Sequence, residues 1–296
     1  MRILAIVNPM AGYRHWTPFL GPTPAQIIQR TFHQMGVPCD IHLTRGSGDG
    51  FLAAKRGVGE GYDTIVAAGG DGTINEVVNG VAGTGVAFGV VPIGTENVLA
   101  KEMKIPLQIE AACRHIVATP PRVLDLGQLD ERYFLCFAGL GLDAQVVAEV
   151  SQEDKSLLGG LSYVLTGLRI AMKYRRLDMK ARILLDGKPL EHRFWLILVG
   201  NIPSYGWQVR LTPLASPDDG LLDVCIFPHE NIIGILRHLL GAVLGVHIRF
   251  PEIAYHKFRE LSIETDPPVK VQIDGELAGT TPCTLRVARG ALVARF

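Results

Sequence analysis

The sequence has few cysteines, and their spacing does not match a metal or disulfide framework. Its five cysteines are Cys39, Cys113, Cys136, Cys225 and Cys283. Their number is odd, they lie far apart, and none forms a CxxC pair. This pattern indicates reduced thiols in the protein interior and argues against disulfides or a zinc site.

The chain also lacks an excess of charge and a hydrophobic run of bilayer length. Its 29 basic and 29 acidic residues balance, so no global positive field attracts nucleic acid, and we expect no nucleic-acid partner. The longest apolar stretch, Ile232 to His247, is interrupted by Arg237 and His238 and is shorter than the roughly 20 residues of a membrane span. The N-terminal MRILAIVNP is too short for a signal peptide. We expect a cytoplasmic protein that is at most peripheral to the inner membrane surface.

What the chain does have is enough apolar sequence for a large core. Of its 296 residues, 48% are hydrophobic and 20% charged, which favours two globular domains. Up to about Pro121, short β-branched runs alternate with helical patterns. The expected strands are ILAIV, CDIHLT, DTIVAA and VAFGVVP, and the expected helices are Pro24 to Met35, Gly50 to Gly57 and Ile74 to Val81. This alternation predicts a parallel sheet with helices on both faces.

From VLDLGQL onward, the pattern changes to strands joined by Gly, Pro and Asp turns, which predicts an antiparallel β domain. We therefore place an α/β domain at residues 1–124 and a β-rich domain at residues 125–289, with residues 290–296 as a candidate return to the first. Two helices, at about 156–174 and 230–247, are expected to interrupt the second domain. Both carry apolar and basic residues, which fits membrane contact, and equally fits packing against the sheet.

The strongest local signal is the glycine-rich segment Gly69 to Thr73, which follows a predicted strand and precedes a predicted helix. Glycines let backbone amides approach a polyphosphate, and the helix N-terminus adds unpaired N–H groups and partial positive charge. The simpler reading is a tight turn with Thr73 as the helix cap. Asp71 favours the phosphate site, because an acid among phosphate-binding glycines needs a magnesium ion or a substrate hydroxyl beside it. The sequence has no GxxxxGK[ST], HRD or DFG motif, so it matches neither P-loop enzymes nor protein kinases.

The segment GGDGTINEVVNG, from Gly69 to Gly80, resembles the signature of the diacylglycerol kinase catalytic domain, a lipid kinase family related to sphingosine kinases and NAD kinases. The further matching segments are VNPMAG, LTRGSGDG, PIGTENVLAKEM, AGLGLDAQV, LTPLASPDDGLLDV and QIDGE. Together they extend over nearly the whole chain. The resemblance implies a Rossmann-like α/β domain of the NAD kinase and diacylglycerol kinase type, a C-terminal β-rich sandwich, and an active site in the cleft between them.

The resemblance also implies an ATP site. The residues that match the family's nucleotide-binding positions are Asn8, Pro9, Gly12, Thr44, Gly69, Gly70, Asp71, Gly72, Thr73 and Thr95. Thr95 follows the strand VAFGVV, so it is also expected at the carboxyl edge of the sheet, where ligands usually bind. Read without the family, Thr95 could equally be a structural cap.

By the same resemblance, Glu276 in the IDGE segment is the general base that accepts the proton of a lipid hydroxyl, with Asp71 as its catalytic partner. Read alone, Asp-Gly between apolar runs indicates only a hairpin turn. The resemblance further assigns a Mg2+ turn, in which Asp219 supplies a carboxylate and Ser216 and Leu221 supply carbonyl oxygens. Asp143 is a weaker candidate, since an acid in an interdomain loop is often a turn residue.

These residues predict an ATP-dependent lipid kinase that uses Mg2+ and phosphorylates diacylglycerol or a related lipid at the membrane surface. Two alternatives stay open: an NAD kinase-like enzyme with a soluble acceptor, and an inactive nucleotide- or lipid-binding protein of the same fold. The sequence does not identify the acceptor lipid. A homodimer is a further partner that it leaves open.

Overall fold

The computed structural model describes residues 1–12, 21–149, 179–206 and 209–296. The helix expected at residues 156–174 lies outside this part of the chain. The described residues form two compact units: Met1–Leu124 together with Arg289–Phe296, and Asp125–Ala288.

The sheet of the first unit is parallel, as the alternating pattern predicts. Its strands lie in the order β2 (Cys39–Leu43), β1 (Ile3–Val7), β3 (Thr64–Gly69), β4 (Ala87–Pro92) and the end of β17 (Cys283–Ala294). Val7 pairs with both Leu43 and Ala68, and Gly69 pairs with Pro92. The carboxyl ends of β2, β1, β3 and β4 therefore lie at one edge, where the chain leaves each strand for a turn.

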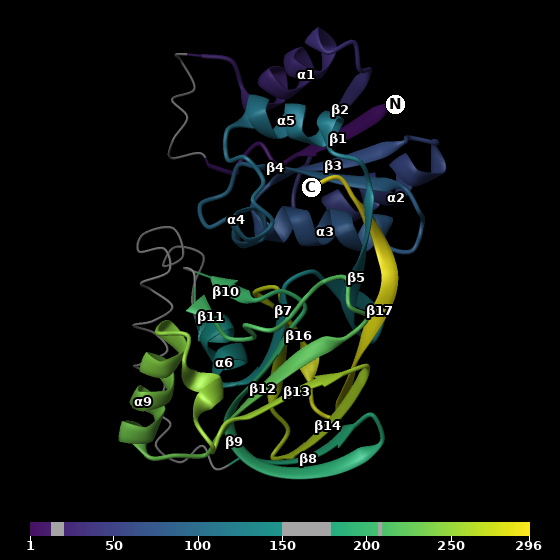
Figure 1. Ribbon diagram of the computed structural model, residues 1–296. Helices are drawn as coiled ribbons and strands as arrows, with labels where there is room; N and C mark the ends of the chain where they lie inside the picture. Colours follow the sequence, from purple (N-terminus) through teal and green to yellow (C-terminus); the bar gives the residue numbers. More distant parts are fainter. Residues whose placement is uncertain (13–20, 150–178, 207–208) are drawn as a thin grey trace. The chain divides into compact units, whose positions relative to one another are not determined.

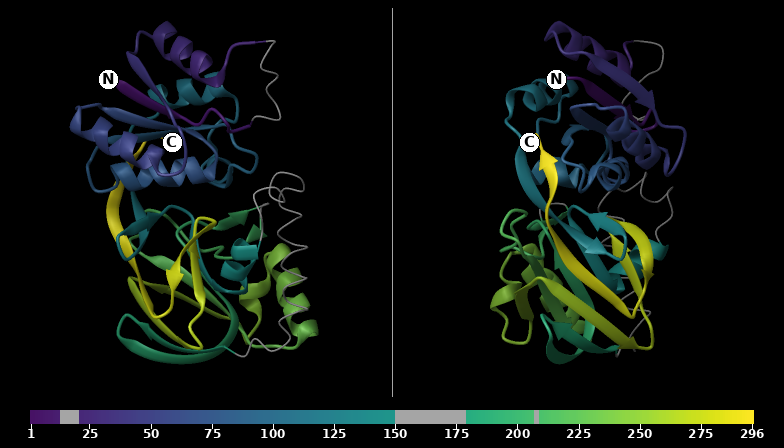
Figure 2. Two further views of the ribbon diagram at one scale, coloured as in Figure 1. Left: turned by 180° about the vertical axis from the view of Figure 1, so that it is seen from behind. Right: turned by 90° about the vertical axis from the view of Figure 1, so that its right-hand side faces the viewer.

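Helices cover both faces of this sheet (Figures 1 and 2). On one face, α1 (Pro24–Gln34) packs against α5 (Ile109–Ala118), and on the other α2 (Asp49–Gly59) packs against α3 (Asp71–Val81). A short helix, α4 (Val98–Glu102), follows β4. Every residue of β1, β3 and β4 is buried, which explains why these strands are continuously apolar.

The second unit is an antiparallel β structure. Its strands are β5 (Arg122–Leu129, which begins in the first unit), β6 (Arg132–Phe134), β7 (Phe137–Gly141), β8 (Met179–Leu185), β9 (Lys188–Gly200), β12 (Leu222–Pro228), β13 (Ala254–Phe258), β14 (Glu260–Asp266), β15 (Lys270–Ile273), β16 (Glu276–Thr280) and the first part of β17. The short strands β10 (Ser204–Gly206) and β11 (Val209–Arg210) pair separately. The long strand β9 pairs with β8 along its first half and with β7 and β12 along its second. Strand β9 thereby connects β8 with β7 and β12 within one sheet.

Strand β12 separates two hydrophobic cores. Val224 and Ile226 pack into a core formed by the strands, whereas Cys225 and Phe227 pack on the opposite face beneath two helices. Those helices are α6 (Leu142–Glu149) and α9 (Ile232–Val243). Because both faces of the strand are covered, alternation of polar and apolar residues disappears from its sequence.

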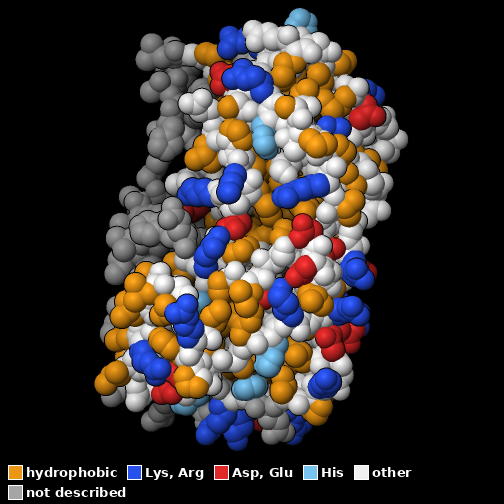
Figure 3. Space-filling view, in the orientation of Figure 1, with side chains coloured by type: hydrophobic (Ala, Val, Ile, Leu, Met, Phe, Trp, Pro, Cys, Tyr) orange, Lys and Arg blue, Asp and Glu red, His pale blue; other side chains and the backbone are white. Residues whose placement is uncertain are grey.

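The second expected helix, at 230–247, is shorter in the structure. The Asn231 side chain caps α9 by accepting a hydrogen bond from the Gly234 amide, and the chain leaves the helix before Gly245, whose φ is +69°. A 3-10 turn (His247–Arg249) follows. Figure 3 shows hydrophobic side chains, with basic ones among them, over the surface that α9 forms. Among the described residues, none of the helices combines the length and apolar character needed to cross a bilayer.

Candidate active site

The glycine-rich segment forms a close turn between β3 and α3. Gly69 ends β3, Gly70 is the N-cap residue, and the helix begins at Asp71, earlier than expected. Gly70 has no side chain to cap the first amides of α3, and an uncapped helix N-terminus of this kind can bind an anion. The alternative reading of Thr73 as the helix cap is wrong, because Thr73 lies inside the first turn.

Steric contacts explain why glycine occupies this turn. A Cβ atom on Gly69 would lie 2.5 Å from the Thr73 side chain, and one on Gly94 would lie 2.5 Å from the Gly70 Cα atom. The backbone of the turn after β4 therefore approaches the backbone of the loop before α3. Gly12 has a φ of +67°, and a Cβ there would lie 2.6 Å from the Ile93 carbonyl oxygen. Side chains at these positions would force the three turns apart.

Hydrogen bonds connect the candidate nucleotide residues at this edge. The Asn8 amide donates to the Ala68 carbonyl at 2.9 Å, and Asn8 Nδ2 donates to Thr73 Oγ1 at 3.2 Å. The Thr44 amide donates to the Val7 carbonyl at 2.9 Å. The structure thus brings together Asn8, Gly12, Thr44 and the loop Gly69 to Thr73. Pro9 lies next to Asn8 in the first turn, and Thr95 is exposed between β4 and α4.

The carboxylate of Asp71 is only partly satisfied by hydrogen bonds. Its Oδ2 atom accepts a hydrogen bond of 3.3 Å from the Val98 amide, but its buried Oδ1 atom has no hydrogen-bond partner among the described residues. Burial raises the pKa of Asp71, and the Val98 and Leu99 amides partly oppose that rise. A buried carboxylate oxygen without a donor is an unfavourable arrangement unless a ligand satisfies it.

Sequence reasoning missed Glu76, which supports this edge. Its Oε1 and Oε2 atoms accept hydrogen bonds from the Gly48 and Gly50 amides, at 2.8 and 3.0 Å. These amides belong to the turn that follows Thr44 and begins α2. Glu76 lies five residues after Asp71 in α3. Its position within the segment GGDGTINEVVNG was the signal that could have identified it.

In the second unit, Glu276 begins β16 directly after a two-residue hairpin turn. Asp274 and Gly275 form the turn with φ angles of +45° and +84°, as expected for an Asp-Gly hairpin. Glu276 is 46% exposed at its side chain, and its Oε2 atom forms an ion pair with Arg132 Nη2 at 3.0 Å. Arg132 was not identified from the sequence.

The turn before Glu276 is held firmly by its neighbours. The Asp274 carboxylate accepts hydrogen bonds of 2.8 to 3.0 Å from the amides of Leu135, Cys136 and Phe137. Gln272 Oε1 accepts a hydrogen bond of 2.8 Å from the Gly275 amide. These contacts fix where Glu276 leaves the hairpin, and the role of Asp274 could not be read from a common turn sequence.

Asp143 was expected in a loop, but the structure places it in the first turn of α6. It is buried and accepts hydrogen bonds from the Tyr205 hydroxyl and, at 2.5 Å, from Gln272 Nε2. Burial raises the pKa of Asp143 to about 6, although both hydrogen bonds act to lower it. Through Gln272, Asp143 is linked to the turn that carries Glu276.

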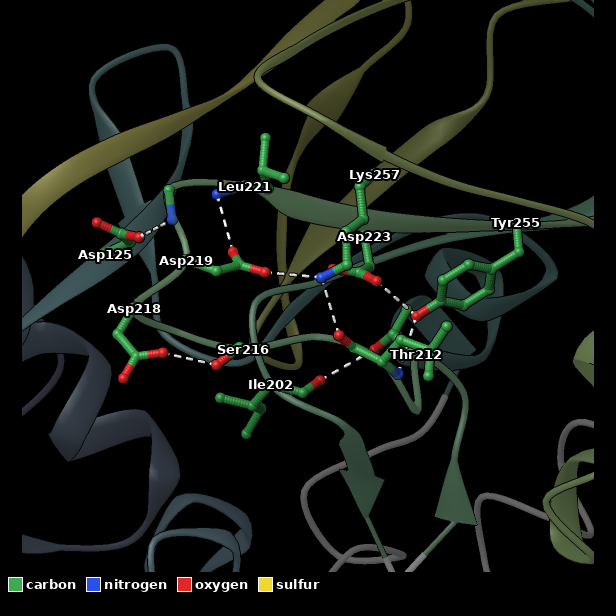
Figure 4. A network of polar contacts seen from close by, with 12 residues as sticks. Asp125, Ile202, Thr212, Ser216, Asp218, Asp219, Leu221, Asp223, Tyr255 and Lys257 are labelled. Atoms are coloured by element: carbon green, nitrogen blue, oxygen red, sulfur yellow. Dashed lines mark hydrogen bonds and ion pairs between the residues drawn. The ribbon is translucent and has the colours of Figure 1, made fainter.

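The residues of the expected Mg2+ turn lie between β11 and β12 (Figure 4). Asp219 Oδ1 accepts a hydrogen bond of 3.0 Å from the Leu221 amide, and Ser216 Oγ donates to Asp218 Oδ1 at 2.6 Å. Asp219 Oδ2 forms an ion pair with Lys257 Nζ at 2.7 Å. A lysine ammonium therefore already binds the carboxylate that the expected Mg2+ site would use. Within the described ranges, no group of three or more His, Cys, Asp or Glu side chains is arranged to hold a metal ion.

Comparison with known proteins identifies both units. The profile of the diacylglycerol kinase catalytic domain matches residues 2–129, and that of the YegS C-terminal NAD kinase beta sandwich-like domain matches residues 137–294. The chain is similar to the diacylglycerol kinase of Bacillus subtilis (strain 168), with 34% identity over 284 residues, which are 95% of this chain and 91% of that protein. It is 30% identical to the diacylglycerol kinase of Staphylococcus aureus (strain MRSA252) over 283 residues, 95% of this chain and 88% of that one.

A solved structure shares the fold. The crystal structure of a diacylglycerol kinase from Bacillus anthracis str. Sterne matches with a TM-score of 0.77 and 24% identity, covering 100% of this chain and 96% of that one. The α/β domain followed by a β-sandwich, inferred from the sequence, is therefore confirmed, and so is the resemblance on which it rested. The chain belongs to the diacylglycerol kinase family of lipid kinases.

Proposed function

We propose that this protein transfers the γ-phosphate of ATP to the hydroxyl group of diacylglycerol or a closely similar lipid. One observation carries the proposal: the uncapped N-terminus of α3 lies behind a glycine turn and beside a buried Asp71 oxygen that has no partner among the described residues. This combination suits the phosphates of a nucleotide. The diacylglycerol kinases of Bacillus subtilis and Staphylococcus aureus support the choice of acceptor.

In this proposal, the first unit binds the nucleotide. The amides of Gly70 to Thr73 donate to phosphate oxygens, and Asn8 fixes Thr73 so that the loop keeps its shape. Asp71 Oδ1 would be a ligand of the Mg2+ that accompanies ATP. When bound, this ion would neutralise part of the negative charge of the phosphates. The other edge residues, Gly12, Thr44 and Thr95, would line the remainder of the nucleotide site.

Glu276 would act as the general base. Its carboxylate accepts the proton of the lipid hydroxyl while the hydroxyl oxygen forms a bond to the γ-phosphorus and the bond to the β-phosphate oxygen breaks, releasing ADP. Arg132 holds one carboxylate oxygen of Glu276, which limits the rotamers available to the base. The Asp274 hydrogen bonds support the same positioning from the backbone side.

The test is transfer of labelled γ-phosphate from ATP to micellar diacylglycerol, to other lipids and to NAD. Glu276→Gln should lower kcat by roughly 10²- to 10⁴-fold, the usual contribution of a general base. Asp71→Asn should also abolish most turnover, whereas Glu264→Gln, at an exposed position of β14, should retain wild-type rates. Label on NAD alone would select the NAD kinase alternative, and wild-type turnover in Glu276→Gln would exclude Glu276 as base.

We further propose that the enzyme reaches its lipid by peripheral binding through α9, on the cytoplasmic side where ATP is present. The face involved carries large exposed apolar side chains at Ile233, Leu236, Leu240, Val243 and Leu244, with exposed fractions from 45% to 74%. Their spacing follows one side of a helix, which is typical of a helix that lies at a membrane surface.

Cosedimentation with vesicles of anionic phospholipid tests this binding. Replacing Ile233 and Leu240 by serine should remove most vesicle binding, because both side chains are more than half exposed on this face. Leu184→Ser, at a 49% exposed residue of β8, is the matched control and should bind as the wild type does. Equal binding by the α9 variant would exclude this surface.

A further inference from the structure

Lys257 binds the Asp219 carboxylate, one of the groups of the turn in which the family resemblance assigns a divalent cation. Its Nζ atom donates to three oxygens: the Leu214 carbonyl at 2.9 Å, Asp219 Oδ2 at 2.7 Å and Asp223 Oδ2 at 3.1 Å. A lysine ammonium group has three N–H donors, and all three are used here. Figure 4 shows the ammonium between the two carboxylates.

The pairing of β12 with β13 places Lys257 there. Asp223 lies opposite Lys257, and Cys225 lies opposite Tyr255, so Asp223, Lys257 and Tyr255 share one face of the ladder. The Tyr255 hydroxyl donates to Asp223 Oδ1 at 2.7 Å, and it accepts a hydrogen bond of 3.2 Å from the Leu214 amide. Both oxygens of the fully buried Asp223 side chain are therefore satisfied from β13.

The turn itself is also held together by hydrogen bonds between protein groups, without an added ligand. Asp219 Oδ1 accepts from the Leu221 amide, while Asp125 Oδ2 accepts from the Gly220 amide at 2.7 Å. The Asp125 amide donates to the Pro217 carbonyl at 2.6 Å. Partial burial acts to lower the pKa of Lys257, but its hydrogen bonds with Asp219 and Asp223 outweigh that effect and raise the pKa.

We infer that the Lys257 ammonium is a built-in cation that takes the place of Mg2+ at the Asp219 turn, so that this turn folds without a divalent ion. The N–O distances of 2.7 to 3.1 Å are those of ammonium hydrogen bonds, whereas Mg2+ requires about six oxygens at roughly 2.0 to 2.1 Å. A divalent ion beside Asp219 would be repelled by Lys257 unless the lysine side chain moved away.

The inference is tested by thermal unfolding without nucleotide, in chelator and in millimolar Mg2+. The wild type and Asp219→Asn should show the same difference in Tm between the two conditions, because any ion bound at Asp71 affects both equally. Lys257→Met keeps much of the aliphatic stem but leaves Asp223 buried without its cation, so its Tm in chelator should fall by roughly 5 °C or more. Mg2+ should restore much of that loss, and the double variant with Asp219→Asn should not respond. Lys180→Met, at an exposed lysine of β8, should unfold as the wild type does.

A second measurement uses the wild-type protein and keeps the inference testable if Lys257→Met does not fold. Electron paramagnetic resonance with Mn2+ should give the same amount of bound ion in the wild type and in Asp219→Asn, even if Asp71 binds some Mn2+. Bound Mn2+ that Asp219→Asn removes would overturn the inference. So would a folded Lys257→Met protein whose Tm does not respond to Mg2+. Neither readout depends on phosphotransfer, so failure here leaves the proposed lipid kinase activity unaffected.

Discussion

Asp143 should make the stability of the second unit depend on pH in an unusual direction. The carboxyl group is buried at the start of α6, and burial raises its pKa from 3.8 to about 6 against the opposing hydrogen bonds from Tyr205 and Gln272. In the unfolded chain, the group returns to its ordinary pKa. The folded protein therefore holds a proton on Asp143 at pH values where the unfolded chain has released it.

The sign follows from proton linkage. Because the folded pKa is raised, the stability that Asp143 contributes is fully present below about pH 4 and is lost as the pH rises through about 6. A difference of about 2 pKa units corresponds to roughly 3 kcal/mol of unfolding free energy. Most carboxylates that are ion-paired in a folded protein have the opposite dependence, so this contribution has to be isolated by a variant.

Asp143→Asn removes the titration and keeps a side chain of the same shape. Urea unfolding of both proteins from pH 4 to pH 7 should show the stability of the variant rising relative to the wild type, by up to about 3 kcal/mol at pH 7. Glu131→Gln, at an exposed carboxylate, should give a difference that does not change with pH. A flat difference for Asp143→Asn, or one that falls as the pH rises, would refute the assignment.

Three further substitutions test how the loops are held. Gly94→Ala places a Cβ against the Gly70 backbone, so it should destabilise the protein by about 1 to 3 kcal/mol and raise the KM for ATP. The control Gly59→Ala, whose Cβ meets nothing within 4 Å, should change neither quantity. Equal KM values for the two variants would show that the two turns move apart freely. Glu76→Gln removes a charged acceptor from two amides and should speed hydrogen exchange at Gly48 and Gly50 by roughly tenfold, from a loss of about 1.5 kcal/mol, and unchanged exchange would contradict its role. Asp274→Asn should cost about 1 to 3 kcal/mol in urea unfolding and lower kcat while leaving the KM for ATP unchanged; a change confined to that KM would contradict its role in positioning Glu276.

The sequence predicts the first unit well because its pattern is local. Buried parallel strands require continuous apolar runs, and β1, β3 and β4 are buried throughout. Helix α5 was missed even though Ile109, Ala112, Cys113 and Ile116 are buried at helical spacing. The start of α3 was placed too late because glycine in a helical first turn reads as a loop.

The polar contacts of the second unit could not be predicted, because they join residues far apart in sequence. Asp274 binds amides about 138 positions away, and Gln272 binds Asp143 across 129 positions. Lys257 meets Asp219 only because β12 and β13 pair in one register. A shift of that register by one residue would turn the lysine to the other face. Single-sequence patterns specify alternation along a strand, but they carry no information about which strand becomes its neighbour.

The completeness of hydrogen bonding separates the acidic residues of this protein into two kinds. The Asp274 carboxylate accepts three amide hydrogen bonds, and the buried Asp223 side chain is satisfied by Lys257 and Tyr255. Such groups already have the partners that a buried charge requires, so a ligand would have to displace them. Asp71 is different, because its buried Oδ1 atom has no partner in the described part of the chain, and binding a cation there would replace nothing. The sequence singles out Asp71 by its glycine-rich segment, but it does not show which carboxylate oxygens already have partners, and this difference in bonding is what supports Asp71, rather than Asp219, as the ligand of the Mg2+ that we propose.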